Sequence, residues 1–254
     1  DYRSAMSLRI WQALGRGTRR TLSVSGVVLF VAILVYQIVL VGTVNTVIVN
    51  SLPPNVSTAD VGSVGFSFPI PTGVAAVVGI GSILFGTAAF LVATRLLSRD
   101  LSALGSIPPS LLGYRFVRAF LSTLVVSLVL AVVIPIGLVF LLVPGLFLAV
   151  SFQFAIFAVG VEDCGPVAAL RRSWELATGN RWRLFGLLAL ITVVAVVASI
   201  PGTVVSLVDP TAGQLVSLFV NSVVAIVMYG IIADAFVQLR EGPTVEPVSG
   251  GAAI

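Results

Sequence analysis

The feature that most constrains the fold is a run of forty-three residues without a charged side chain, from Ala119 to Val161. A single helix of that length would extend about 64 Å at 1.5 Å per residue, roughly twice the hydrocarbon core of a bilayer. The run therefore predicts two membrane-spanning helices joined by a turn. Residues 138–143, between them, are as apolar as the helices, so the tip of this hairpin is expected either inside the protein or at the membrane interface. The turn is marked by two proline–glycine pairs, Pro135 with Gly137 and Pro144 with Gly145.

The whole chain has the composition of a membrane protein. Hydrophobic residues make up 58% of it and charged residues only 9%, which leaves too little polar surface to cover a water-soluble globule. The apolar runs are continuous and do not alternate with polar residues, so they predict helices and argue against a β-barrel. We predict an all-α, polytopic, six-transmembrane-helix bundle with a cytoplasmic N-terminal amphipathic segment over 1–23 and a cytoplasmic tail over 238–254. The predicted spans are about 24–46, 74–94, 116–134, 145–161, 184–208 and 213–237.

The arginines predict the orientation of these spans. The chain has no lysine and no histidine, so all fourteen basic side chains are arginines. Five precede the first span, four lie between the second and third, four between the fourth and fifth, and one follows the sixth, which leaves none for the outer loops. The positive-inside rule therefore predicts a multi-pass protein of the cell membrane with both termini in the cytoplasm. All three tryptophans lie near the same predicted boundary, as in an aromatic belt.

The stretch from Glu162 to Arg183 separates the fourth and fifth spans and predicts an amphipathic interfacial helix over 166–178. Its predicted membrane-facing apolar stripe consists of Val167, Leu170, Trp174 and Ala177. Its predicted polar side carries Arg171, Arg172 and Glu175.

The two ends of this helix are also predicted from residue type. The Asp163 carboxylate is placed to favour a helix N-terminus, and Pro166 suits the first turn. Gly179 suits a left-handed exit at the other end. Within the helix, Arg172 and Glu175 are spaced for an ion pair.

A stripe of small residues runs along the second span at alternating spacings of four and three. Such a stripe lets another helix backbone approach closely, which is a main source of helix association in lipid. It predicts packing against a neighbouring span of the same chain, with a homodimer seam as the alternative. The stripe consists of Ala75, Gly79, Ser82, Gly86, Ala89 and Ala93.

The middle of the chain resembles a known family. The residues that carry the resemblance are Pro144-Gly145-Leu146, the pair Glu162-Asp163, Gly165-Pro166, the segment Ala169-Leu170-Arg171-Arg172-Ser173-Trp174-Glu175-Leu176, Gly179-Asn180 and Arg181-Trp182-Arg183-Leu184. This pattern resembles the prokaryotic glycerophosphoryl diester phosphodiesterase membrane-domain family and related six-helix membrane proteins. The resemblance implies a fold and a topology. The family takes its name from fusions to a soluble phosphodiesterase domain, which these 254 residues do not contain, so that activity is not expected.

Catalysis is not expected from the side chains present. Without histidine or lysine there is no ordinary general base near neutral pH, no imidazole metal site and no P-loop lysine. Glu162 and Asp163 could hold a divalent metal as a pair, but helix capping and pairing with arginines explain them more simply. We expect no cofactor and no metal.

The predicted function is that of a non-catalytic membrane scaffold or accessory module. Its cytoplasmic arginine and tryptophan face would bind anionic lipid head groups or a protein partner. Besides membrane lipids, the candidate partners are a second copy of the chain and another membrane protein. Binding to nucleic acid is not expected, because the basic residues are spread along a membrane face. The predicted lipid- or partner-binding residues are Arg171, Arg172, Trp174, Arg181, Trp182, Arg183, Trp11, Arg115 and Arg118.

The alternative function is a small-solute or lipid transporter or channel. Polar residues inside membrane helices are the usual indication of a transport pathway. In this chain the candidates are Gln153 in the fourth span and Asn221 and Asp234 in the sixth.

Overall fold

The computed structural model describes residues 15, 21, 23–53, 55–56, 64–99, 113, 115–140 and 142–241. This part of the chain is all-α, without a strand, and has six helical segments long and apolar enough to cross a membrane. The predicted all-α polytopic fold is therefore confirmed, and the chain is a multi-pass integral membrane protein. Most of the predicted N-terminal segment, with Trp11, lies outside the described residues. The helices are α3 (Val24–Asn50), α4 (Thr72–Leu97), α6 (Phe116–Phe140), α7 (Leu142–Phe152), α8 (Ala155–Glu162), α9 (Pro166–Ala177), α10 (Arg181–Ser206) and α11 (Pro210–Glu241).

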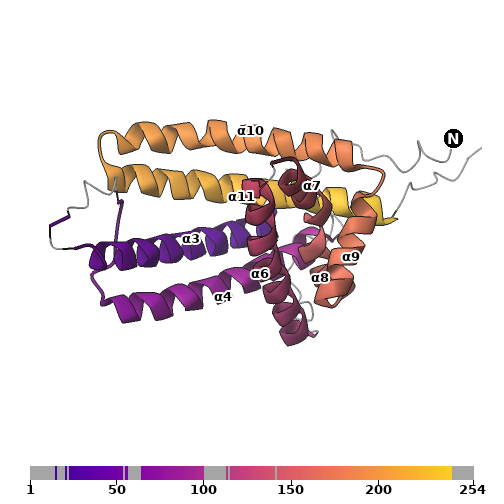
Figure 1. Cartoon of the computed structure of the whole chain (residues 1–254), viewed down its shortest axis with the longest axis horizontal. Coiled ribbons are helices and arrows are strands. Elements are labelled where there is room, and N and C mark those ends of the chain that lie inside the picture. The colour runs from indigo at the N-terminus through magenta and orange to yellow at the C-terminus, as the bar shows by residue number, and fades with distance from the viewer. Residues whose placement is uncertain are drawn as a thin grey trace, which may run out of the picture.

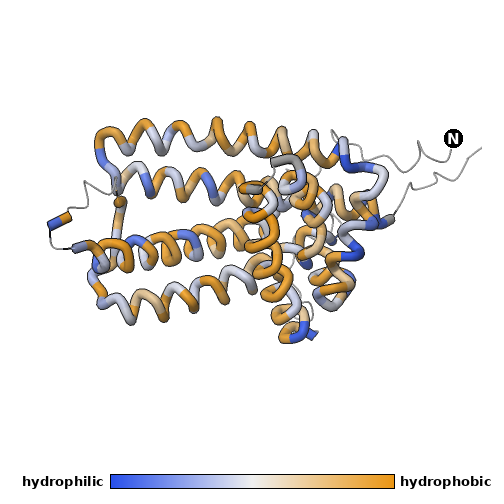
Figure 2. Tube along the Cα trace, in the orientation of Figure 1, coloured by the Kyte–Doolittle hydropathy of each residue, from blue (hydrophilic) through white to orange (hydrophobic). Residues whose placement is uncertain are grey.

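Four long helices run side by side and give the molecule its length. Figure 1 shows them in the order α10, α11, α3 and α4, and Figure 2 shows that most residues along these helices are hydrophobic. At one end of the molecule, α3 and α10 begin and α4 and α11 finish. We call it the arginine end, because every described arginine lies in a segment that begins, ends or packs there. The opposite end, where α3 and α10 end and α4 and α11 begin, is the loop end.

The other four helices gather at the arginine end. Figure 1 shows α6 running across the direction of the long helices, over α4 and α3, with α7, α8 and α9 beside it. The fourth predicted span, 145–161, is not one helix: α7 ends at Phe152, and α8 starts at Ala155 after a two-residue turn. The sequence predicted a continuous helix here because nothing in this apolar run distinguishes a break from a helix interior.

The hairpin of α6 and α7 turns later than predicted. We expected the third span to end near residue 134, before Pro135, but α6 continues through that proline to Phe140, and the described backbone resumes at Leu142 in α7. Proline costs a helix one hydrogen bond, which membrane helices tolerate when neighbouring groups compensate. Gly137 and Gly145 face each other across the hairpin so closely that a Cβ on either would meet the opposing backbone.

The larger of two clusters of buried apolar residues in the described part of the chain also lies at the arginine end. Phe154 and Phe157, at the start of α8, contact Phe236 of α11 with ring centroids 6.0 and 5.6 Å apart. These residues belong to one buried cluster that draws side chains from α3, α4, α7, α8, α9, α10 and α11. Apolar burial therefore fastens the short helices to the ends of the long ones.

The loop end is closed by an extended segment, residues 64–70, that crosses from α11 to α3. Asn45 Nδ2 donates to Phe66 O (2.8 Å) and to Gln214 Oε1 (3.0 Å), which also accepts from Phe66 N (3.0 Å). Phe68 N donates to Thr46 Oγ1 (2.7 Å). The absence of a side chain on α3 at Gly42 leaves room for both phenylalanine rings.

Candidate functional site

The interfacial helix predicted over 166–178 is present as α9, and it begins at Pro166 as expected. Its protein-facing side consists of small and apolar residues, among them Ala169, Ser173 and Ala177, which are fully buried. The prediction that the stripe forms one membrane-facing surface is therefore wrong. Val167 is 81% exposed, but Ala177 faces the protein. Helical spacing alone predicted the stripe, whereas the small side chains decide which side approaches α8 most closely.

The hydroxyl of Ser173 joins α9 to the break between α7 and α8. Ser173 Oγ accepts from Phe154 N (3.1 Å) and donates to Ser151 O (2.8 Å), so it satisfies two backbone groups that the break leaves without helical partners. The break and the buried face of α9 are thus parts of one arrangement. A buried serine within an otherwise apolar helix face was the signal that sequence reasoning missed.

Arg181 fastens the start of α10 to the aromatic rings beside it. Its guanidinium carbon lies 4.5 Å from the ring centroid of Trp174 and 4.6 Å from that of Phe147, and the two rings contact each other edge to face at 5.4 Å. An arginine over two aromatic faces is held by cation–π attraction. Trp174 and Arg181, two of the predicted lipid-binding residues, are therefore largely engaged with each other.

Trp182 and Arg183 point outward from the first turn of α10. The Trp182 side chain is 87% exposed, and its one described ring contact is with Phe185 at 6.3 Å. Arg183 is also exposed and makes no ion pair with any described residue. We call these two residues the α10 patch.

The remaining arginines of the central stretch pair with nearby carboxylates. Arg172 donates from Nε to Glu162 (3.0 Å) and from Nη2 to the same carboxylate (3.3 Å), with Glu175 at 4.0 Å. Arg171 pairs with Glu175 at 3.2 Å, and both side chains are exposed. The predicted pair of Arg172 and Glu175 is present, but Glu162 is the closer partner of Arg172.

Asp163 does not cap a helix N-terminus as predicted. It ends α8 with a left-handed backbone (φ 52°), and Gly165 is the N-cap residue of α9. Its carboxylate instead lies 3.3 Å from Arg95, whose side chain is only 7% exposed. Arg95 Nε also donates to Gly160 O at 3.0 Å, so one arginine of α4 holds the end of α8.

Cys164 lies between α8 and α9. Burial raises the pKa of its thiol, and the nearby charge of Glu162 raises it further, while Arg172 acts in the opposite direction. At any given pH below that pKa the thiol is therefore less ionised than an ordinary cysteine.

Arg115 and Arg118, at the start of α6, do not join the α10 patch. Figure 1 shows the starts of α6 and α10 on opposite sides of the molecule, and Figure 2 shows hydrophilic residues at both places. The predicted arginine face is therefore divided into separate patches.

The small-residue stripe of α4 lies against α3. Ala75, Ser82, Gly86 and Ala89 are buried, and a side chain at Gly86 would meet the ring of Tyr36. Gly79 lies against Thr43, and Ala93 is fully buried nearer the arginine end. The close approach that the stripe permits is therefore used within this chain.

The polar residues considered for a transport pathway do not line one cavity. Asp234 is 1% exposed and accepts a hydrogen bond from Gln238 (2.8 Å), whereas Asn221, on the same helix, is exposed on the outer surface. Gln153 lies at the turn between α7 and α8, where its Nε2 is buried and makes no hydrogen bond to any described residue.

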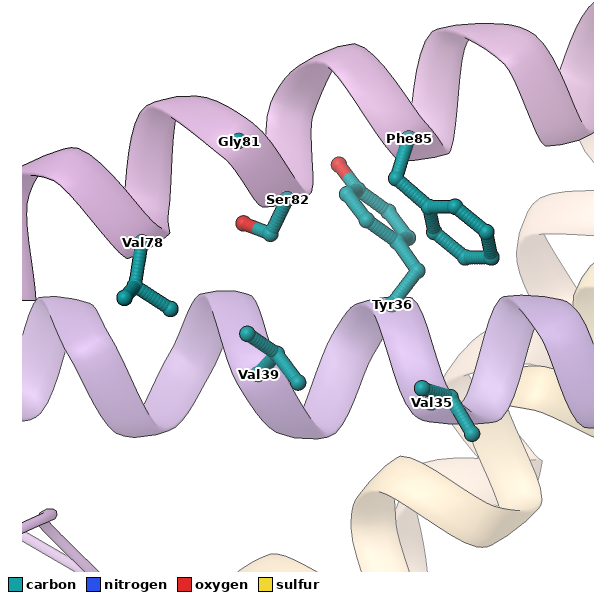
Figure 3. A pocket seen from close by; sticks show the side chains of 7 residues that line it. All are labelled: Val35, Tyr36, Val39, Val78, Gly81, Ser82 and Phe85. Atoms are coloured by element: carbon teal, nitrogen blue, oxygen red, sulfur yellow. The ribbon is translucent and has the colours of Figure 1, made fainter.

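The crevice shown in Figure 3 is apolar and open. It has a volume of about 380 Å³, lies between α3 and α4, and carries no charged side chain. The hydroxyl of Ser82 on its wall is bonded to Gly79 O (2.7 Å). This is an apolar surface groove, lined by Val35, Tyr36, Val39, Val78, Gly81, Ser82 and Phe85.

Comparison with known proteins places the chain in one family. Residues 8–239 match the domain of unknown function DUF7847. The chain belongs to the DUF7847 family. No curated protein and no solved structure matches it. Because the DUF7847 description carries no function, the resemblance to the glycerophosphoryl diester phosphodiesterase membrane-domain family stays a prediction.

Proposed function

We propose that this DUF7847 protein is a non-catalytic membrane scaffold or accessory module that binds anionic lipid head groups through the α10 patch. The observation that carries the proposal is an 87% exposed tryptophan beside an exposed arginine with no ion pair among the described residues. Indole rings favour the head-group region of a bilayer, and guanidinium groups bind phosphate with two parallel hydrogen bonds. Both residues lie in the first turn of an apolar helix of 26 residues.

The arginine end would face the cytoplasm. All described arginines belong to this end, and the positive-inside rule assigns such an end to the cytoplasmic side. Arg95 and Arg172 are already paired with carboxylates of the same chain, which leaves Arg183 better placed for a phosphate group. The alternative occupant of the α10 patch is a protein partner.

The experiment compares anionic and zwitterionic lipids. Thermal unfolding of the purified protein in detergent would be followed while short-chain phosphatidylglycerol or phosphatidylcholine is added, and the apparent affinity taken from the shift in Tm. One arginine near an anionic surface is worth about 1 kcal/mol, so Arg183→Gln should weaken phosphatidylglycerol binding about fivefold. Trp182→Ala should weaken it as well.

The control for this experiment is Arg171→Gln, which makes the same change in net charge at an exposed arginine paired with Glu175. It should have a smaller effect than Arg183→Gln. Equal losses in the two variants would show that only net charge matters, and unchanged phosphatidylglycerol binding by Arg183→Gln would overturn the assignment to the α10 patch.

The transport alternative has less support. A pathway needs polar groups that line one route, but Asp234 is buried and bonded to Gln238 whereas Asn221 faces outward. A route between α3 and α11 would also meet the extended segment 64–70 at the loop end.

A further inference from the structure

The direction of α6 conflicts with a simple six-crossing arrangement. Figure 1 shows α3, α4, α10 and α11 sharing one direction and α6 running across that direction, over α4 and α3, on the side of the arginine end. Helices that cross a bilayer together lie within a few tens of degrees of its normal. If the four long helices cross, α6 lies in or near the plane of the membrane.

The burial of α4 shows how far the α6–α7 hairpin reaches along the molecule. From Ala93 to Leu97, at the arginine end, every residue of α4 is buried. Toward the loop end only the side that faces α3 is buried, and large apolar residues such as Val77 and Ile80 are exposed. The hairpin and α8 therefore cover only the arginine-end part of α4.

The pattern of buried residues in α6 also indicates that the hairpin packs against the rest of the protein over only part of its length. Its buried residues all lie between Ala119 and Val126, and none of the described side chains from 127 to 139 is buried. The returning segment 144–162 has the length of one crossing, but a two-residue turn divides it into α7 and α8, and neither helix is long enough to cross alone. At 1.5 Å per residue, α7 (11 residues) extends about 16 Å and α8 (8 residues) about 12 Å, against a hydrocarbon core of about 30 Å.

The outward face of α6 is apolar over its whole length. Exposed residues recur every three or four positions, and no charged residue occurs between Ala119 and Val161. In water, such a continuous apolar stripe would be a strong aggregation site, so its position on a membrane protein requires acyl chains against it. The stripe consists of Val117, Leu121, Val125, Leu128, Val132, Ile136 and Val139.

We propose that the α6–α7 hairpin enters the bilayer from the arginine side and stays in that leaflet. The α6 stripe then contacts the acyl chains of one leaflet, and only α3, α4, α10 and α11 cross the membrane. The arginines do not distinguish this arrangement from six crossings, because in both of them the segments before α6 and after α8 lie on the same side. The proposal does not depend on lipid binding by the α10 patch.

The first experiment labels single cysteines in sealed vesicles. In a Cys164→Ser background, Val139→Cys at the hairpin tip is compared with Val208→Cys at the loop end and Val167→Cys at the arginine end, all three positions being at least 81% exposed. A membrane-impermeant maleimide is added to one side at a time. Val208→Cys and Val167→Cys should label from opposite sides, and Val139→Cys should stay unlabelled from the Val208 side while labelling fully after denaturation.

Six crossings predict the reverse result at the tip. Residue 139 would then lie at the same surface as residue 208, and its labelling from that side within about tenfold of the Val208→Cys rate would overturn the proposal.

A second measurement tests the depth of α6 without relying on the tip. A fluorophore on Leu128→Cys, an exposed position midway along α6, is placed in phosphatidylcholine–phosphatidylglycerol vesicles with nitroxide-labelled phosphatidylcholine exchanged into one leaflet. Quenching several-fold stronger by the arginine-side leaflet is the expected result. Equal quenching by both leaflets, as for a residue at the middle of a crossing helix, or no quenching by either, would overturn the proposal.

Discussion

Arg95 of α4 lies 3.3 Å from the carboxylate of Asp163, which ends α8 in a left-handed turn, so this ion pair helps to hold a long helix against the short helices. Replacing Asp163 by asparagine removes the charge but keeps a residue that tolerates the left-handed backbone. Because the Arg95 side chain is only 7% exposed, losing its anionic partner should cost about 1–3 kcal/mol. The apparent Tm in detergent should fall by roughly 2–12 °C.

The matched control for Asp163→Asn is Glu175→Gln. It also removes one carboxylate from an ion pair at the arginine end, but both partners of the Arg171–Glu175 pair are exposed. Exposed pairs contribute about 0–1 kcal/mol, so the change in Tm should be small. Equal changes in Tm for the two variants would contradict the role assigned to Asp163.

The contact between α3 and α4 gives a second prediction. The same change, glycine to alanine, is made separately at two positions of α4. At Gly86 an added methyl group would meet the Tyr36 ring, whereas at Gly81 it would meet nothing within 4 Å. Gly86→Ala should destabilise the protein by about 1–3 kcal/mol through overpacking. Gly81→Ala should stabilise it by about 0.5–1 kcal/mol, because alanine loses less entropy in a helix. Thermal unfolding of both variants tests the difference, and a lower Tm for Gly81→Ala than for Gly86→Ala would refute it.

A third prediction concerns the hydroxyl of Ser173. In Ser173→Ala, the amide of Phe154 and the carbonyl of Ser151 each lose a buried partner. The cost should be about 1–3 kcal/mol, and the amide of Phe154 should exchange its hydrogen faster. Ser199→Ala is the control, because that exposed hydroxyl bonds only to Val196 O within its own helix. Unchanged exchange at Phe154 would show that the Ser173 hydroxyl does not hold the break.

The pH dependence of Cys164 alkylation gives a fourth prediction. A raised pKa means less thiolate at a given pH, so the rate of alkylation should reach half its maximum at a higher pH than in a cysteine peptide. Glu162→Gln removes a charge that raises this pKa and frees Arg172, which lowers it, so the profile should move to lower pH. Glu175→Gln should leave the profile near that of the unmodified protein, and a shift to higher pH in Glu162→Gln would contradict the assigned cause.

The parts of the fold that could be predicted are those set by local chemistry. Charge-free runs long enough to cross a bilayer gave the long helices, because a membrane helix must satisfy its own backbone. Pro166 starts α9 and Gly179 has a left-handed backbone (φ 87°), as their residue types predicted. At the candidate site, the exposure of Trp182 and Arg183 follows from their position at the start of an apolar helix.

What could not be predicted depends on packing between distant segments. An apolar helix surrounded by lipid and protein has no polar face from which its orientation relative to other helices could be inferred. The sequence therefore did not indicate that α6 runs across α4. Asp163 was assigned to the nearest helix N-terminus, because its actual partner, Arg95, is 68 residues away in the chain. The rings of Phe147 and Trp174 meet around Arg181 for the same reason: three segments converge there.

The extended segment 64–70 makes the two ends of this protein respond differently to ionic strength. At the loop end it connects α3 and α11 by neutral hydrogen bonds and partly buried rings, which dissolved salt does not screen. The arginine end depends partly on ion pairs that are within reach of solvent, such as Arg172 with Glu162. Raising the ionic strength should therefore weaken ion pairs at the arginine end, where the buried apolar cluster remains, and leave the hydrogen bonds of the loop end unchanged.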